Sequence, residues 1–318
     1  MYIIPHMIIN TGGRTDTVQY FSPWLLNRFK EGYVLSRNPM FPEKVTRYEL
    51  TPSKVDCVVF CSKNYESILP RLHEITDRFN TYFFYTITAY GKDIEPGVPS
   101  IDQSIDTLLK LEKLVGAKKI TWRYDPVLLT KKYTIQQHLI TFGHMAARLS
   151  GHVRECVFSF VELYKKLQFN FPEMLILTDE DMEELARGMG QIARKNRLVL
   201  KSCATKRDYS AYGILPPGCM TLDILGDAND VKFKKLRHNG MRRFCHCITS
   251  HDIGAYNTCI NGCKYCYANS DHEEAKENYK KHNPLSPLLF GELNKNDIIQ
   301  IGNQKSFIDD SNLQATLF

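Results

Sequence analysis

The sequence predicts an α/β protein whose strands form a full or partial parallel β/α barrel of the TIM type. Short apolar, β-branched runs alternate with amphipathic stretches from the start of the chain to about residue 205, in six or more units. Such alternation is typical of parallel strands joined by right-handed crossovers. The alternative is an open doubly wound sheet. It is less favoured because Thr11-Gly12-Gly13-Arg14, after the first expected strand, lacks the spacing of a dinucleotide-binding fingerprint.

Six stretches have the composition of buried strands, since they are short and rich in β-branched and aromatic residues. They are Met7–Asn10, Asp56–Cys61, Tyr82–Thr88, Lys119–Arg123, Glu155–Phe160 and Leu198–Cys203. Four longer stretches have apolar residues at helical spacing together with start or stop signals. They begin at Ser22, Ile101, Thr134 and Thr178, and they end near Gly32, Val115, Leu149 and Asn196. The elements alternate along the chain, as a β/α fold requires.

The helical and strand periodicity fades after residue 205, where Pro216-Pro217-Gly218 and many cysteines follow. This composition indicates an irregular segment stapled by metal rather than by a large core. We therefore expect three regions: a β/α barrel-like domain at 1–205, a cysteine-rich iron–sulfur segment at 206–270, and a polar extension at 271–318 packed on the surface.

The composition, with 43% hydrophobic and 24% charged residues over 318 positions, is that of a folded protein. No run of eighteen apolar residues exists, so we expect no membrane span. Met1–Asn10 has no basic leader, which indicates a cytoplasmic protein. The net charge of +6 is modest, and the densest basic stretch is more often a solvated face than a nucleic-acid contact. It comprises Lys232, Lys234, Lys235, Arg237, Arg242 and Arg243.

Ten cysteines are many for such a chain, and without a secretion signal they favour metal binding or redox chemistry over disulfides. Cys259, Cys263 and Cys266 fall within one short stretch and could bind three corners of a 4Fe-4S cluster. The fourth iron would then stay open for a cofactor or substrate. Gly262 would let the backbone turn tightly beside the cluster.

Zinc is the alternative metal for this motif. A structural zinc site needs four ligands, and the spacing of three cysteines at i, i+4 and i+7 is uncommon for one. The fourth ligand would have to come from Cys245, His246, Cys247 or His251.

The motif resembles that of the radical S-adenosylmethionine superfamily, with aromatic Tyr265 just before the last cysteine. The resemblance implies that the open iron binds S-adenosylmethionine and that one-electron cleavage releases a 5′-deoxyadenosyl radical. It places Tyr265 near the adenine, and we group Asn257 and Gly262 with it as cofactor-binding candidates. It also implies a flavodoxin or ferredoxin as electron donor. These enzymes usually carry the motif after the first strand, whereas here it follows the whole barrel pattern.

Nearly the whole chain also resembles the family called domain of unknown function 1848, which implies no activity. The matching segments are Gly13–Asp16, Gly32–Leu35 with Arg37–Pro39, Trp122–Pro126, Ser159-Phe160, Asp252–Cys259 and Ser286–Leu289.

Four further cysteines form a second candidate set, which could saturate an auxiliary iron–sulfur cluster or be ordinary buried residues. They are Cys203, Cys219, Cys245 and Cys247. The other three, Cys57, Cys61 and Cys156, lie in expected strands and are assigned to the core.

Catalytic candidates lie in the loops that follow the carboxyl ends of the expected strands. They are Arg14, Asp16, Lys63, Arg123 and Asp125, with Asn64 and Glu162 as lesser candidates. An arginine could clamp a carboxylate or phosphate, and Asp125 could orient Arg123. The alternative is a structural ion-pair network around the rim. His138 and His144, on an expected helix, are read as packing or surface residues.

The sequence thus favours an iron–sulfur enzyme, of radical S-adenosylmethionine type, acting on an unknown small molecule. The first alternative is a non-radical iron–sulfur protein for electron transfer or redox sensing. The second is a nucleic-acid repair enzyme of photoproduct-lyase type.

Overall fold

The computed structural model describes residues 7–164, 166–234 and 244–309. Its central sheet has the strand order β8-β7-β6-β5-β4-β1-β9, and every pairing in it is parallel. The strands are β1 (Ile8–Asn10), β4 (Cys57–Ser62), β5 (Thr81–Thr86), β6 (Ile120–Val127), β7 (Glu155–Phe160), β8 (Leu200–Ser202) and β9 (His251–Asp252). The predicted α/β class is therefore confirmed.

All six predicted strands are present, and each lies within a few residues of its predicted limits. The four predicted helices are α2 (Ser22–Glu31), α4 (Ile101–Val115), α5 (Ile135–Leu149) and α7 (Asp179–Lys195). Capping explains their ends: Ser100 and Thr178 form capping boxes with the residues three positions on. At its other end α2 stops at Gly32, whose φ of 79° favours glycine.

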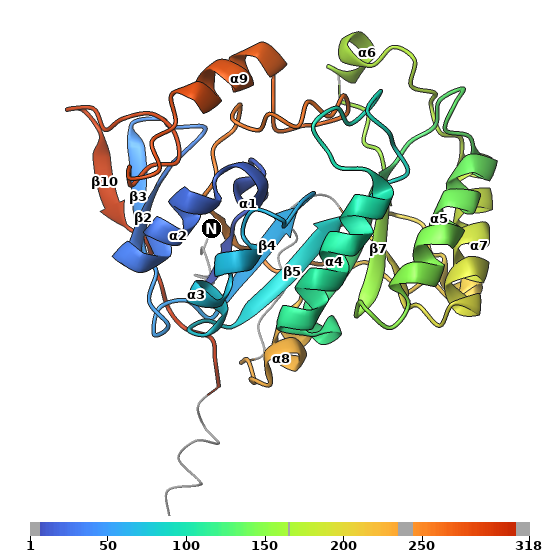
Figure 1. The fold of residues 1–318 in the computed structure, drawn as a ribbon, viewed down its shortest axis with the longest axis horizontal. Coiled ribbons are helices and arrows are strands. Elements are labelled where there is room, and N and C mark those ends of the chain that lie inside the picture. The colour runs from blue at the N-terminus through green and yellow to red at the C-terminus, as the bar shows by residue number, and fades with distance from the viewer. Residues whose placement is uncertain (1–6, 165, 235–243, 310–318) are drawn as a thin grey trace, which may run out of the picture.

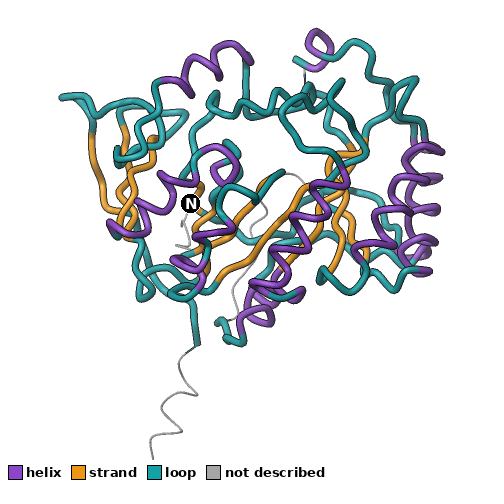
Figure 2. The backbone as a smooth tube through the Cα atoms, viewed as in Figure 1, coloured by secondary structure: helices purple, strands orange, loops and turns teal. Residues whose placement is uncertain are grey.

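The sheet is covered by helices on one face. The strand order from β1 through β8 never reverses, so right-handed crossovers place the connecting helices on the same side. Figure 2 shows the strands in the middle of the molecule with the helices outside them, and Figure 1 shows α4, α5 and α7 side by side. The core between them contains the fully buried side chains of Trp24, Trp122 and Phe142. Trp122 and Phe142 stack with ring centroids 5.1 Å apart.

The chain that follows β8 covers the opposite, inner face of the sheet. It contains α8 (Leu222–Asn229), which begins at the cap residue Thr221. Its buried side chains form a separate cluster with those of β1, β4, β5 and β7. The cluster includes Ile8, Val59, Tyr82, Phe84 and Val157 from the sheet, and Cys219, Met220, Leu225, Cys247 and Ile248 from this covering chain.

Among the described residues, β8 and β9 are the edges of the sheet and do not pair with each other. Closure of the predicted barrel is therefore not shown. Leu215 extends the β8 edge through hydrogen bonds with Leu200 and Ser202 of 2.9 and 3.2 Å.

A second sheet has the strand order β10-β3-β2 and was not predicted. Its strands are β2 (Tyr33–Arg37), β3 (Lys44–Glu49) and β10 (Ile298–Ile301). β10 and α9 (His272–Lys280) come from the stretch expected as a polar extension, and β10 pairs in parallel with β3. Short helices complete the fold: α1 (Thr17–Tyr20), α3 (His73–Thr76) and α6 (Leu167–Asn170), with 3₁₀ turns at Leu69–Arg71, Ala117–Lys119 and Ser210–Tyr212. None of the helices in the described residues is long and apolar enough to cross a bilayer.

His138 lies on α5 and is fully buried, as a packing residue, whereas His144 on the same helix is exposed. The Nε2 atom of His138 lies 2.8 Å from the carbonyl oxygen of Leu128, so it carries the proton and donates. The Nδ1 atom therefore accepts from the hydroxyl of Tyr124, at 2.6 Å. Burial lowers the pKa of His138 to about 4, so the ring is neutral at pH 7.

We expect His138 to make the fold sensitive to acid. The imidazole is protonated in the unfolded chain below its ordinary pKa of about 6.5, but the folded protein resists this protonation until about pH 4. The contribution of the neutral His138 ring to the free energy of unfolding is therefore fully present above pH 6.5. As the pH falls toward 4, this contribution decreases by about 3 kcal/mol. Urea unfolding at pH 7 and pH 4 measures this loss.

The control is His138→Gln, which removes the titrating ring. Its stability should fall by about 3 kcal/mol less than that of the native protein over the same pH range. Equal losses in the two proteins would contradict the assignment.

Candidate metal centre

The predicted cluster motif lies in the loop after β9, which crosses the carboxyl edge of the parallel sheet. Two backbone hydrogen bonds attach this loop to the one that follows β5. The amide of Gly97 donates to the carbonyl of Asn261 at 2.8 Å, and the amide of Lys264 donates to the carbonyl of Ile94 at 3.1 Å. In Figure 1 the orange stretch after β9 passes along the top of the molecule between α9 and α6. The motif therefore lies beside the loops in which an α/β fold carries its sites.

Asn261 connects the motif to the loop after β1. Its side-chain oxygen accepts a hydrogen bond of 2.9 Å from the hydroxyl of Tyr20, and its amide nitrogen lies 3.4 Å from the Asp16 carboxylate. Asp16 also accepts from the Ser62 hydroxyl at 2.6 Å and from the Lys63 amide at 2.9 Å. Burial raises the pKa of Asp16, while these hydrogen bonds act in the opposite direction. The structure thus places Asp16, a predicted catalytic residue, where it joins the loops after β1, β4 and β9.

The three motif thiols lie in one neighbourhood that excludes much of the solvent. Cys259 and Cys263 are buried, and Cys266 is partly buried. Burial raises the pKa of Cys259 to about 12, and the nearby charges of Asp16 and Cys266 add to the effect. Burial also raises the pKa of Cys263, with Glu95 as the next contribution. A bound metal would reverse this, because coordination deprotonates a thiol.

In the described residues, no three cysteine, histidine, aspartate or glutamate side chains already converge as a formed metal site. The donor set has the chemistry that an iron–sulfur cluster requires, because three cysteines of one loop lie in the same neighbourhood and cluster iron is bound by thiolates. The Cys266 sulfur also accepts a hydrogen bond of 3.3 Å from the amide of Ala268, of the kind that tunes cluster thiolates.

Glu95 is the site residue that the sequence did not reveal. It is 2% exposed, and one of its carboxylate oxygens accepts from the Lys63 ammonium at 2.9 Å, from the Thr88 hydroxyl at 2.7 Å and from the Tyr265 hydroxyl. The positive charge of Lys63 in turn lowers the pKa of Cys263. The only local signal was a carboxylate in the turn after the third predicted strand.

The three cofactor-binding candidates have structural partners. The Tyr265 ring is buried beside Tyr90, with the centroids 5.8 Å apart. The Asn257 side chain donates to Glu274 at 3.0 Å and accepts from the Ser270 amide at 2.6 Å, so it fastens the start of α9. Gly262 has a φ of 67°, and a β-carbon there would meet Pro96 only at an ordinary contact distance. Its left-handed backbone, and not crowding, is what requires glycine.

The remaining catalytic candidates form ion pairs along the same edge. Arg123 pairs with Asp125, which also accepts from the Ser159 hydroxyl. The Arg123 guanidinium lies 3.3 Å from the sulfur of Cys61, so this cysteine contacts the rim. Arg14 lies 4.0 Å from Asp252, at the end of β9. The predicted catalytic residues are therefore brought to the carboxyl edge of the sheet. There they form ion pairs, as expected for the structural network that was the alternative to a catalytic role.

The second set of cysteines is also brought together. The sulfur of Cys219 lies 4.0 Å from that of Cys203 and 3.3 Å from that of Cys247. The Cys245 sulfur accepts a hydrogen bond of 3.4 Å from the Cys247 amide. Cys57 and Cys156 are fully buried in β4 and β7, as predicted.

Comparison with known protein families gives one match. The family described as "Domain of unknown function (DUF1848)" matches residues 8–268. The chain belongs to this family. No curated protein and no solved structure matches it. The matched region of this DUF1848 protein includes the parallel sheet and both sets of cysteines, and it ends just after the last cysteine of the motif.

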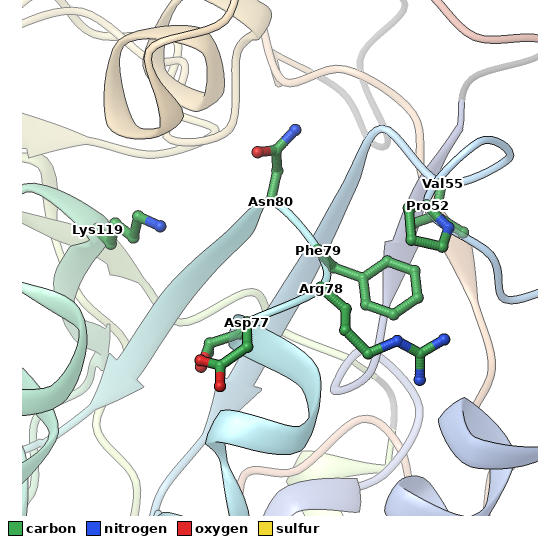
Figure 3. A pocket seen from close by; sticks show the side chains of 8 residues that line it. Pro52, Val55, Asp77, Arg78, Phe79, Asn80 and Lys119 are labelled. Carbon is green, nitrogen blue, oxygen red and sulfur yellow. The ribbon is translucent and has the colours of Figure 1, made fainter.

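A cavity of about 280 Å³ lies at the opposite, amino edge of the sheet of this DUF1848 protein. Figure 3 shows Asn80, Lys119 and Val55 lining it, each from a turn that precedes a strand. The Asn80 amide is held by the carbonyl of Asp56 at 3.1 Å. This edge of a β/α fold usually serves stability, so the cavity is not a candidate active site. Of the basic stretch, Lys235, Arg237, Arg242 and Arg243 lie outside the described residues.

The buried pair of Lys63 and Glu95 should be costly to break. Glu95→Gln leaves the ammonium of Lys63 without its countercharge, in a place where the side chain of Lys63 is only 13% exposed. We expect a loss of about 3 kcal/mol in the free energy of unfolding, measured with urea.

The matched control is Glu66→Gln. Glu66 also pairs with a lysine, Lys110, at 2.9 Å, but both side chains are more than half exposed. Its loss should stay below about 1 kcal/mol. Equal losses in the two variants would show that the Lys63 charge finds another partner.

Proposed function

We propose that this DUF1848 protein is an iron–sulfur enzyme of the radical S-adenosylmethionine type. In this proposal Cys259, Cys263 and Cys266 hold a 4Fe-4S cluster at the carboxyl edge of a partial β/α barrel. The observation that supports it most is the attachment of the motif loop to that edge, through the backbone bonds of Gly97 and Lys264 and through Asn261. A motif that follows β9, the last strand of the central sheet in sequence, thus lies beside the loops after β1 and β5.

Three thiolates would hold the cluster and leave its fourth iron for S-adenosylmethionine. The chemistry supplied there would be one-electron cleavage of the carbon–sulfur bond, which yields a 5′-deoxyadenosyl radical. The protein's own contribution would be to exclude water and to hold charge. The buried rings of Tyr90 and Tyr265, with Leu128, form an apolar cluster around Cys263. Lys63 would offset part of the negative charge of the thiolates.

The ion pairs along the same edge would serve the substrate or cofactor. Arg123 and Arg14 carry guanidinium groups that suit a carboxylate or phosphate, and Asp125 fixes the orientation of Arg123. The substrate is a small molecule whose class these groups do not define. A flavodoxin or ferredoxin would supply the electron, and a reducing compartment such as the cytoplasm would keep the thiols free.

The experiment is anaerobic reconstitution of the full chain with iron and sulfide. It is followed by reduction with dithionite in the presence of S-adenosylmethionine. We expect about four irons at the motif, a paramagnetic signal that changes when S-adenosylmethionine is added, and 5′-deoxyadenosine as product. Cys263→Ala should lose the product and most of this iron, because two thiolates are too few to keep the cluster.

The control is Cys156→Ala, which removes a buried cysteine of β7 and should keep both iron and product. Wild-type amounts of 5′-deoxyadenosine from Cys263→Ala would overturn the proposal. A reconstituted cluster that is reduced but yields no 5′-deoxyadenosine would instead indicate electron transfer or redox sensing.

A further inference from the structure

The second set of cysteines lies on the inner face of the sheet, in a different cluster of buried side chains from Cys263 of the motif. Cys203 directly follows β8, Cys219 precedes α8, and Cys247 comes from the stretch that leads to β9. Their sulfurs form a row, with Cys219 in the middle, 4.0 Å from Cys203 and 3.3 Å from Cys247. Cys219 is therefore in contact with thiols from two distant parts of the chain.

The distances between these sulfurs distinguish between a zinc site, an iron–sulfur cluster and a disulfide. Four thiolates around one zinc ion, with zinc–sulfur bonds of about 2.3 Å, form a tetrahedron with edges of about 3.8 Å. The two measured distances lie on either side of that value. In a 4Fe-4S cluster each thiolate binds a different iron, so the thiolate sulfurs are held apart by the cluster core. A disulfide would need its sulfurs at about 2.05 Å.

The surroundings also resemble those of a bound thiolate. The amide of Met220 donates to the Cys247 sulfur at 3.4 Å, and the amide of Cys247 donates to the Cys245 sulfur at 3.4 Å. Amide hydrogen bonds of this kind orient metal-bound sulfur. A backbone bond of 2.8 Å from Ile248 to Met220 holds the two stretches in register. Cys245 thus lies next to the row and supplies a fourth thiol.

The place of these cysteines on the inner face of the sheet explains why a metal ion bound by them would stabilise the fold. In the part of the covering chain that the structure describes, α8 is the one α-helix, and β8 is an edge strand of three residues. One metal ion would tie β8 to both ends of the covering segment, and the apolar side chains of Val59, Phe84 and Met220 would shield it from water. Arg123, whose side chain is partly buried and whose charge interacts with Cys219 and Cys203, would offset part of the thiolate charge.

The geometry points to a second, mononuclear metal site in which Cys203, Cys219, Cys245 and Cys247 bind one zinc ion. No three ligand groups among the described residues already surround one point, so these thiols would close around the ion when it binds. This assignment replaces the auxiliary iron–sulfur cluster expected from the sequence, and it does not depend on the proposed function. The ion would have four protein ligands and no open position, as structural zinc sites do. Its role would be to staple the inner-face segment to the sheet.

The test uses the full chain carrying Cys263→Ala, so that the motif contributes little metal. Metal analysis of this protein, expressed with both zinc and iron available, should give about one zinc per chain. Adding Cys219→Ser should lower the zinc content at least tenfold. Adding Cys57→Ala instead should leave it unchanged, because Cys57 is an equally buried thiol of the same inner face but lies outside the set.

A second measurement does not require a variant at the site. Exchange of the bound ion for Co²⁺ should give the intense visible absorption of a tetrahedral tetrathiolate complex. Iron with acid-labile sulfide in the Cys263→Ala chain would overturn the assignment in favour of an auxiliary cluster. A mass lower by two hydrogens, with no metal, would overturn it in favour of a disulfide between Cys219 and Cys247. The absence of both metal and disulfide would also overturn it.

Discussion

Both faces of a parallel sheet have to be buried, and in this protein the two faces are covered in different ways. The crossover helices cover the outer face with large apolar side chains. No crossover helix remains for the inner face, because the strand order runs in one direction from β1 to β8. The chain after β8 covers it with α8 and with stretches that have little regular structure. Cys203, Cys219 and Cys247 lie in the smaller cluster of buried side chains that this segment forms with the inner face.

The same constraint determines how the motif loop reaches the edge of the sheet. After covering the inner face, the chain rejoins the sheet as β9 and then passes over the carboxyl ends of the strands. Buried polar groups fix its position there. Asp16, in the loop after β1, accepts hydrogen bonds from the end of β4 and from the loop after β9, and Glu95 accepts from Lys63, Thr88 and Tyr265. A carboxylate with so many partners orders the loops around it, because any loop that moves leaves a buried polar group unpaired.

The sequence was sufficient for elements whose pattern is local. Glu155–Phe160 is short and built around the apolar residues Cys156–Phe158, and it was predicted to the residue. Ile101–Val115 has its own cap and its own terminating glycine. Lys44–Glu49 was missed because it is mostly polar, with Val45 as its one buried residue, and because it pairs with β10 from the far end of the chain. Such pairing is decided by tertiary contacts that no local window contains.

The residues of the candidate site also divide into those with a local sequence pattern and those that only tertiary contacts bring together. Cys259, Cys263 and Cys266 could be grouped from their spacing, and the rim residues from their place after strands. Glu95 could not be found in this way, because its importance comes from three donors that lie on other parts of the chain. The row of sulfurs on the inner face depends on the path of the covering segment, which the sequence does not specify.

The pairing of β9 with β1 has a consequence for the order in which the molecule can be completed. The first strand to leave the ribosome has one neighbour in β4, but its other neighbour is made only when residue 252 has been synthesised. Domains form largely as units during translation, from the amino end onward. A nascent chain can therefore assemble the helical layer early. The loop with the cysteine motif is synthesised late and attaches to loops that already exist. If the proposed function holds, metal would be loaded at that loop after translation, on a scaffold that is otherwise already folded.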